Sequence, residues 1–140
     1  MNTFLPYADF EAAARALDER RLGKQRVEGF QILRAIHIPT YGWQNHPAVR
    51  MWRGHEGSLL EYTRAMCREW VLRGHPDTVS ASIEREFAHV IPTERYAPPS
   101  WLGDRDLHLS HQSNLLRKDP DFYRARFGDI PPGLPYVWPV

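Results

Sequence analysis

The segment Leu17–Gly29, LDERRLGKQRVEG, carries amine, guanidinium and carboxylate groups at helical spacing. Read as a helix, it places Leu17, Arg21, Lys24 and Glu28 on one face. Upstream, that face is apolar, with Phe10, Ala13 and Ala14. Charges that continue an apolar stripe are expected to face a cleft, a ligand or one another. The alternative is a solvated salt-bridge cluster, because Lys24 and Glu28 also form an i,i+4 pair.

An amine beside a carboxylate and guanidinium groups can perform nucleophilic and proton-transfer chemistry. An amine must be neutral to attack, and α-amines titrate at about pH 8 whereas lysines titrate at about pH 10.4. The N-terminal amine therefore needs less activation than the side chain of Lys24. A carboxylate such as Glu28 beside either amine could move protons or stabilise a developing cation.

Other chemistries lack support in the sequence. There is no GxSxG motif and no glycine-rich loop that could hold a phosphate group. His108 and His111 have a spacing that can bind a metal, but no third ligand is evident. We therefore expect hydrogen-bonded histidines, no metal ion and no cofactor. Cys67 is the only cysteine, which excludes an internal disulfide and favours a role as a small apolar filler.

The cations are unevenly distributed, although the net charge is only +1. Apart from Lys24 and Lys118, the side-chain cations other than histidine are arginines, which suit bidentate recognition of phosphate. Basic residues cluster early and late in the chain, namely Arg20, Arg21 and Arg26, then Arg117, Lys118, Arg124 and Arg126. Brought together, they would form a basic face for nucleic acid. The alternative is a mixed surface on which Asp and Glu cancel the positive charge.

Helical periodicity and capping residues predict an all-α fold, with no β-alternation of useful length. Asp9 is expected to cap a long first helix over about 10–36, in which Gly23 and Gly29 indicate a bend or a close backbone approach. Two to three further main helices follow, with shorter helical pieces opened by Pro47 and Pro120. Their expected positions are about 56–73, from 79 onwards, 105–117 and 120–128.

The remainder of the chain is rich in proline. Residues 92–104 form a Pro-rich loop, and the tail after Gly128 is too apolar for a free linker, so Tyr136 and Trp138 are expected to dock onto the body. We expect a single compact domain over residues 1–140. No apolar run reaches the ~20 residues of a membrane span, and no signal peptide is evident. The expected protein is therefore a cytoplasmic monomer without a membrane segment.

Three segments resemble the pyrimidine-dimer DNA glycosylases, also called phage endonuclease V. They are LDERRLGKQRVE (17–28), CREWVLRG (67–74) and DPDFYRARFG (119–128). The first resembles the family's first helix, which bears a catalytic Glu among Arg residues, and the others resemble its middle and late helices. The chain is most similar to a bacterial branch with RLGKQRVE and YVWP.

The resemblance implies a compact all-α fold that binds double-stranded DNA at a damaged or abasic nucleotide and flips a nucleotide out. In the family, the N-terminal α-amine attacks C1′ of the damaged nucleotide, forms a Schiff base and breaks the strand by β-elimination. Glu28 falls at the catalytic Glu, with Glu19 as the alternative under a shifted match. The family exposes Thr after removal of its initiator Met; here the nucleophile would be the amine of Met1, that of Asn2, or Lys24.

The resemblance also implies the DNA contacts. Arg21 and Arg26, with Arg20 beside them, match the first-helix phosphate contacts. Arg124 and Arg126, with Phe122 and Tyr123, match the C-terminal aromatic loop at the DNA, and Arg117 and Lys118 of the same basic cluster are further expected DNA contacts. Two alternatives remain open from the sequence. One is a helical nucleic-acid-binding module without catalysis, and the other is an enzyme that uses Lys24 and Glu28 on a small carbonyl substrate.

Overall fold

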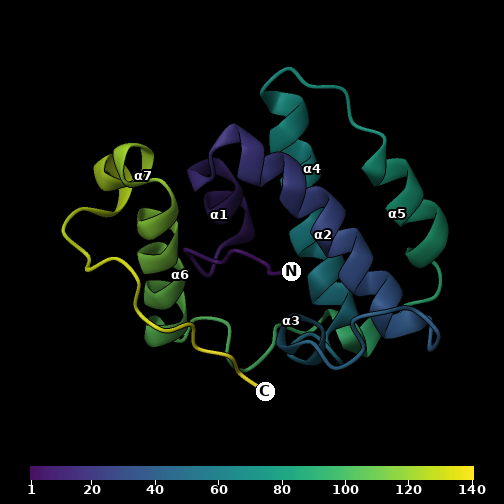
Figure 1. Cartoon of the computed structure of the whole chain (residues 1–140). Helices are drawn as coiled ribbons and strands as arrows, with labels where there is room; N and C mark the ends of the chain where they lie inside the picture. The colour runs from purple at the N-terminus through teal and green to yellow at the C-terminus, as the bar shows by residue number, and fades with distance from the viewer.

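The computed structural model describes residues 1–140 and contains helices but no strands (Figure 1). The α-helices are α1 (Phe10–Ala16), α2 (Glu19–His37), α3 (Pro47–Arg50), α4 (Glu56–Leu72), α5 (Val79–Phe87), α6 (Arg105–Lys118) and α7 (Pro120–Phe127). A short 3-10 helix, η1, spans Thr93–Tyr96. The prediction of a compact all-α fold is confirmed. No helix is long and apolar enough to cross a membrane.

The prediction of one long first helix is wrong, because the chain breaks at Leu17 and Asp18. Leu17 is extended, with ψ 143°, and its side chain is buried in the core. The Asp18 carboxylate accepts a hydrogen bond from the Arg21 backbone N–H (3.4 Å), which caps α2. The backbone N–H of Asp18 donates to the Tyr123 hydroxyl oxygen (3.0 Å) on α7. This long-range contact and the cap together favour two helices over one.

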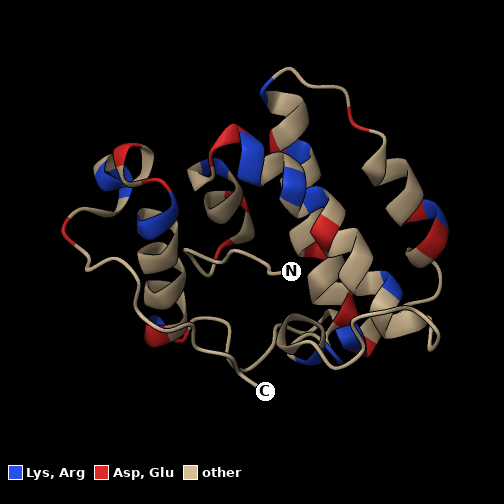
Figure 2. Cartoon of the chain, in the orientation of Figure 1, with Lys and Arg blue, Asp and Glu red and all other residues tan.

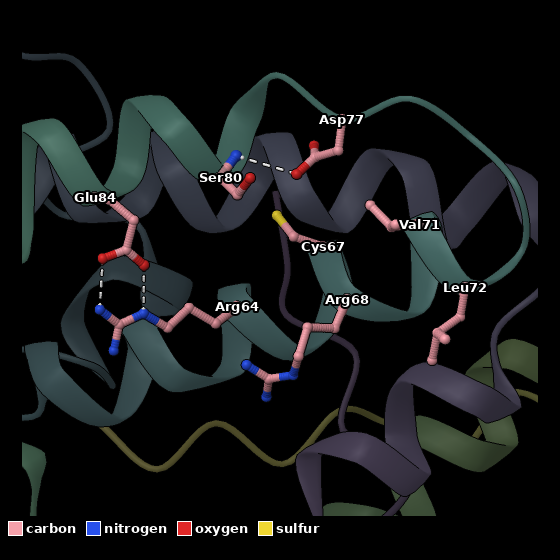
Figure 3. A pocket seen from close by; sticks show the side chains of 8 residues that line it. All are labelled: Arg64, Cys67, Arg68, Val71, Leu72, Asp77, Ser80 and Glu84. Carbon is pink, nitrogen blue, oxygen red and sulfur yellow. Dashed lines mark hydrogen bonds and ion pairs between the residues drawn. The ribbon is translucent and has the colours of Figure 1, made fainter.

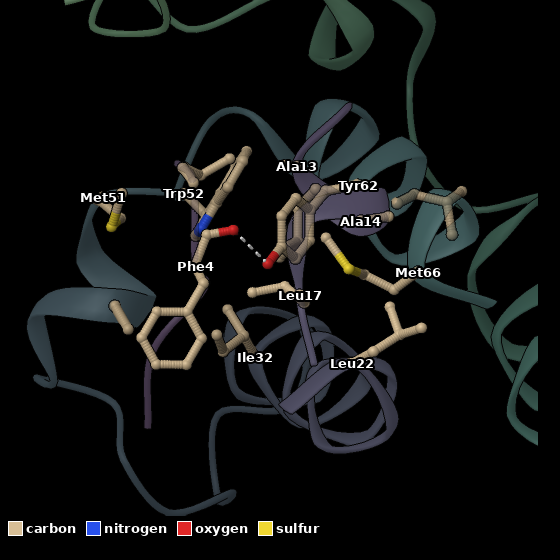
Figure 4. Close-up of a cluster of buried hydrophobic side chains, with 14 of the residues drawn as sticks. Phe4, Ala13, Ala14, Leu17, Leu22, Ile32, Met51, Trp52, Tyr62 and Met66 are labelled. Carbon is tan, nitrogen blue, oxygen red and sulfur yellow. Dashed lines mark hydrogen bonds between the residues drawn. The ribbon is translucent and has the colours of Figure 1, made fainter. Parts of the chain in front are cut away.

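The core lies where α2 crosses α4, and α1 also packs against α4. Figure 4 shows the side chains at its centre, among them Trp52, Tyr62 and Met66, which are fully or almost fully buried. A hydrogen bond joins the Tyr62 hydroxyl to the carbonyl oxygen of Phe4 (2.8 Å), so that the N-terminal segment belongs to this core. The tail docks as predicted, because Tyr136 and Trp138 pack against the same cluster.

Gly29 allows α2 and α4 to approach each other closely. A Cβ atom at this position would overlap the Thr63 Oγ1 atom. We expect Gly29→Ala to lower the free energy of unfolding by about 1–3 kcal/mol, because one of the two helices must shift. Gly42→Ala is the matched control, because a Cβ there meets nothing within 4 Å. Urea denaturation of both variants checks this, and equal midpoints would contradict it.

Candidate active site

The N-terminal segment, residues 1–8, runs between α2 and α6 (Figure 1), and its residues 2–6 are buried. Thr3 and Leu5 are fully buried. The Trp52 indole Nε1 donates to the Thr3 hydroxyl (3.0 Å), and the Phe4 backbone N–H donates to Gln25 Oε1 (2.8 Å). These contacts fix the first residues of the chain, so the position of the N-terminal amine is set by tertiary structure.

Helix α6 holds the same segment from the other side. The Leu5 backbone N–H donates to His111 Nδ1 (2.9 Å), and His108 Nδ1 donates to the Leu5 carbonyl oxygen (2.8 Å). Gln112 Nε2 donates to the carbonyl oxygen of Pro6 (2.7 Å). The His108 and His111 pair, which has metal-ligand spacing in the sequence, thus binds the backbone of the N-terminal segment.

Burial lowers the pKa of His111 to about 3, and neighbouring His108 adds to this effect. The native imidazole is therefore neutral, whereas the unfolded one takes up a proton near pH 6.5. Because the unfolded state then binds more protons, we expect native stability to fall by about 1.4 kcal/mol per pH unit between pH 6 and 4.

The measurement compares thermal or urea unfolding of the parent and of His111→Asn over that pH range. The variant lacks the titrating group but retains an acceptor oxygen for the Leu5 N–H. The free energy of unfolding of the variant should depend on pH less steeply than that of the parent, by about 1.4 kcal/mol per pH unit. This difference in slope is expected whatever the absolute stability of the variant. Parallel slopes for the two proteins would show that His111 is not responsible.

A pocket of about 400 Å³ opens where the N-terminal segment meets α2, α6 and the tail; we call it the N-terminal pocket. It is lined by Met1, Asn2, Phe4, Arg20, Arg21, Lys24, Gln25, Glu28, His46, Lys118, Tyr136 and Trp138. The cationic residues of this lining come from α2 and the end of α6, and we call them its cationic side. His46, Trp138 and Tyr136 are neighbouring rings, which we call its aromatic side, and Met1 and Glu28 line the same pocket. The structure therefore brings the face predicted from Arg21, Lys24 and Glu28 together with the chain's own N-terminus.

Glu28 is positioned by Gln25, which lies one helical turn before it and is almost completely buried. Gln25 Nε2 donates to Glu28 Oε2 (2.7 Å) and to the carbonyl oxygen of Asn2 (3.2 Å). Its Oε1 also lies 2.6 Å from the Tyr62 hydroxyl, which donates to it. One amide thus joins the N-terminal segment, the candidate carboxylate and the core. Sequence reasoning missed Gln25; its i,i+3 spacing to Glu28 was the available signal.

The pKa of His46 is affected by burial and by both the N-terminal amine and Glu28. Burial is the main reason that the pKa of His46 is lowered; the positive N-terminal amine lowers it further, and Glu28 acts in the opposite direction. The His46 Nδ1 atom accepts the Ala48 backbone N–H (3.0 Å) and so caps α3. The amine and Glu28 therefore each lie within electrostatic range of His46. His46 was not among the candidates from sequence.

The cationic side of the N-terminal pocket joins α2 to the end of α6. Arg20 and Lys24 are exposed, and Arg21 pairs with Asp18 at 3.2 Å. The pKa of Lys118 is lowered by burial and then by the positive charges of Arg117, Arg21 and Lys24, which places these groups near one another. Figure 2 shows Lys and Arg on the first half of α2, at the end of α6 and on α7. Of the two basic clusters of the sequence, Arg20 and Arg21 from the early one and Lys118 from the late one thus line the same pocket.

Arg26 does not line the pocket, in contrast to its expected role as a phosphate contact. Its guanidinium pairs with Asp77, and only 13 % and 2 % of the two side chains are exposed. The guanidinium carbon also lies 4.5 Å from the centre of the Trp70 ring. The structure therefore assigns Arg26 to joining α2 to the start of α5. Its partner lies 51 residues away, which sequence spacing could not reveal.

Tyr123 also differs from its expected role. It is fully buried, and its hydroxyl donates to the Asp18 carboxylate, so it joins α7 to the break between α1 and α2. Its neighbours on α7 remain at the surface. Arg124 Nη1 donates to the carbonyl oxygen of Gly128 (2.8 Å), and the Arg126 guanidinium lies 3.9 Å from the centre of the Phe122 ring. Arg117 is exposed at the end of α6.

Glu19, the alternative catalytic carboxylate, lies outside the N-terminal pocket. It is exposed and pairs with Arg73 (3.0 Å) and with His75. The hydrogen bonds of His75 and Arg73 lower its pKa. The geometry therefore favours Glu28 over Glu19.

A second pocket, of about 520 Å³, lies between α4 and α5 (Figure 3). Its charged groups already have partners: Arg64 binds Glu84, with Nε 2.6 Å from Oε1, and Asp77 pairs with Arg26. Burial raises the pKa of Cys67 to about 12, so its thiol is a poor nucleophile. Neither the N-terminus nor Glu28 reaches this pocket, which therefore lacks the candidate chemistry.

A model of a protein family described as pyrimidine dimer DNA glycosylase matches residues 1–82 of the 140. No curated protein and no solved structure matched the chain. The matched part contains Met1, Gln25 and Glu28, whereas Lys118, Tyr136 and Trp138 of the same pocket lie beyond it. The match covers more than half of the chain and includes the residues that the N-terminal segment and α2 bring together. The chain therefore belongs to the pyrimidine dimer DNA glycosylase family.

Proposed function

We propose that this protein is a base-excision glycosylase with AP-lyase activity on damaged pyrimidines in double-stranded DNA. The observation that carries the proposal is that Met1 and Glu28 line one pocket with a cationic side. An amine, a carboxylate and phosphate-binding groups are the parts that imine-based strand cleavage requires. No metal or cofactor enters the proposed reaction.

In the proposed first step, the neutral N-terminal amine forms a bond to C1′ of the damaged nucleotide as the N-glycosidic bond breaks. The base leaves with the bonding electron pair and takes up a proton. The sugar ring then opens, with O4′ accepting a proton, and C1′ becomes an imine with the amine nitrogen. α-Amines as a class suit this step, because they are neutral far more often than lysines at neutral pH.

Glu28 acts on protons in this scheme. Its carboxylate accepts a proton from the attacking amine and passes it to O4′ as the sugar ring opens; ionised again, it stabilises the positive charge of the protonated imine. Removal of a proton from C2′ of the imine then expels the 3′-phosphate by β-elimination. Gln25 is a positioning residue, because it donates to Glu28 Oε2 (2.7 Å) and to the carbonyl oxygen of Asn2 (3.2 Å).

The cationic side of the pocket should bind phosphate. We expect Arg20→Ala and Lys118→Ala each to reduce the slope of log affinity against log salt by about 0.9, because each removes one phosphate contact. Arg85→Ala on α5 is the control, since Arg85 donates to Ser82 (3.3 Å) away from the pocket. Fluorescence anisotropy on duplex DNA at several salt concentrations measures the slopes. A slope near zero in the parent protein would argue against DNA as the partner.

Borohydride trapping on a duplex with an abasic site tests the proposed activity, together with incision of a duplex that contains a pyrimidine dimer. A covalent adduct and a cleaved strand are expected. Binding without an adduct would overturn the proposed chemistry and favour the helical nucleic-acid-binding module. Neither binding nor an adduct would favour an enzyme of a small carbonyl substrate.

A further inference from the structure

Three aromatic rings lead from the N-terminal pocket to the surface: Trp138, His46 and Trp43, which we call the aromatic row. The ring centres of Trp138 and His46 lie 6.1 Å apart, and those of His46 and Trp43 lie 5.8 Å apart. Trp138 and His46 line the pocket, whereas Trp43 extends the row outwards and is 61 % exposed. The proposed reaction assigns no role to these rings.

Trp43 is the only non-glycine residue with a positive φ, at 69°. This left-handed conformation is unfavourable for a bulky side chain and occurs where surrounding contacts impose it. Trp43 is exposed and is not among the aromatic residues that pack against the core. Packing against the core therefore explains neither the positive φ of Trp43 nor the presence of an indole side chain at this position.

The loop around Trp43 is held firmly. Gln44 Nε2 lies within hydrogen-bonding distance of three carbonyl oxygens, those of Ala35 (2.7 Å), Ile38 (3.0 Å) and Tyr41 (2.9 Å). The His46 backbone N–H donates to the Trp43 carbonyl oxygen (3.0 Å). The backbone that carries the exposed indole is thus held in place next to His46 before any ligand binds, which reduces the entropy lost on binding.

The chemistry of the pocket indicates what the exposed indole binds. The side with Arg20, Lys24 and Lys118 suits phosphates, and the aromatic side offers flat π-faces. A planar group attached to a phosphate backbone matches both sides, and bases stack on aromatic side chains with little sequence preference. We propose that Trp43, supported by His46, is the stacking subsite for a DNA base that has left the duplex. This inference rests on the proposed function, because such a base appears only when the enzyme opens the duplex.

The test measures affinity for two duplexes of one sequence, of which one contains a tetrahydrofuran abasic analogue and the other is intact. Trp43→Asn removes the indole and keeps a residue that tolerates positive φ, so the loop conformation is retained. We expect it to weaken binding to the abasic duplex by about 5-fold to 150-fold, the range for loss of one stacked base. Binding to the intact duplex should change by less than about twofold.

Trp43→Phe should retain most of the affinity for the abasic duplex, because it keeps an aromatic face. Leu72→Ala is the surface control, since Leu72 is 79 % exposed at the end of α4. Unchanged binding of Trp43→Asn to the abasic duplex, or an equal loss on both duplexes, would overturn the stacking subsite. The tetrahydrofuran analogue cannot form an imine, so the affinities for the two duplexes do not depend on cleavage. Borohydride trapping by the parent on a natural abasic duplex therefore tests the proposed function separately from the stacking subsite.

Discussion

Glu28→Gln is expected to lower the rate of strand cleavage by about 10²-fold to 10⁴-fold, the usual contribution of general acid–base catalysis. The substitution keeps the shape of the side chain and an oxygen that can accept the Gln25 amide N–H, whose present distance to Glu28 Oε2 is 2.7 Å. The negative charge and the proton acceptor are lost. Affinity for an abasic duplex should therefore change little, while the rate of cleavage falls.

Single-turnover cleavage of an abasic duplex at saturating protein measures this effect. Glu19→Gln is the matched control, because Glu19 lies on the same helix but pairs with Arg73 (3.0 Å) outside the pocket. It should cleave at the parent rate. Parent-like cleavage by Glu28→Gln would remove Glu28 from the mechanism, and a slow Glu19→Gln would support the shifted match.

The second large effect concerns the nucleophile. We expect mass spectrometry of a borohydride-reduced adduct to find the sugar on the N-terminal peptide, not on the peptide that contains Lys24. α-Amines are neutral on the order of a hundred times more often than lysines at neutral pH. Met1 and Asn2 both line the pocket, so the prediction holds whichever of them begins the mature chain.

Two variants separate the competing amines. A Gly-Ser extension before Met1 moves the α-amine and should abolish trapping, although the fold and DNA binding remain. Lys24→Met should still form the adduct at saturating DNA, with lower affinity, because Lys24 lies on the cationic side of the pocket. A label on Lys24, together with an unmodified N-terminal peptide, would reverse the assignment.

Local signals in the sequence predicted much of the helical framework. Asp9, Pro47 and Pro120 mark helix starts because capping and fixed φ act within a few residues. The face with Arg21, Lys24 and Glu28 was also predicted from spacing, since these residues lie on one helix. The break before α2 was missed, although Asp18 is a good N-cap, because an apolar helical pattern appeared to continue through it.

Contacts between distant segments were not accessible from sequence. The sequence predicts Arg26 as a phosphate contact, but in the structure its guanidinium pairs with Asp77. It predicts Tyr123 as a DNA contact, but the Tyr123 hydroxyl donates to Asp18. The roles of Gln25 and of the tail residue Trp138 also depend on what packs next to them. Spacing along one helix predicts which side chains share a face, but it does not predict which residues from distant segments bind to those side chains.

The way α6 holds Leu5 has a consequence for protein synthesis. Hydrogen bonds between Leu5 and two α6 residues, His108 and His111, which are translated about a hundred residues later, hold the segment that carries the amine. A nascent chain still attached to the ribosome, or one cut short before α6, lacks these partners and holds the segment only through Gln25, Trp52 and Tyr62. We therefore expect incomplete chains to react more slowly with DNA than the finished chain, so that full strand-breaking capacity arises only when translation has finished.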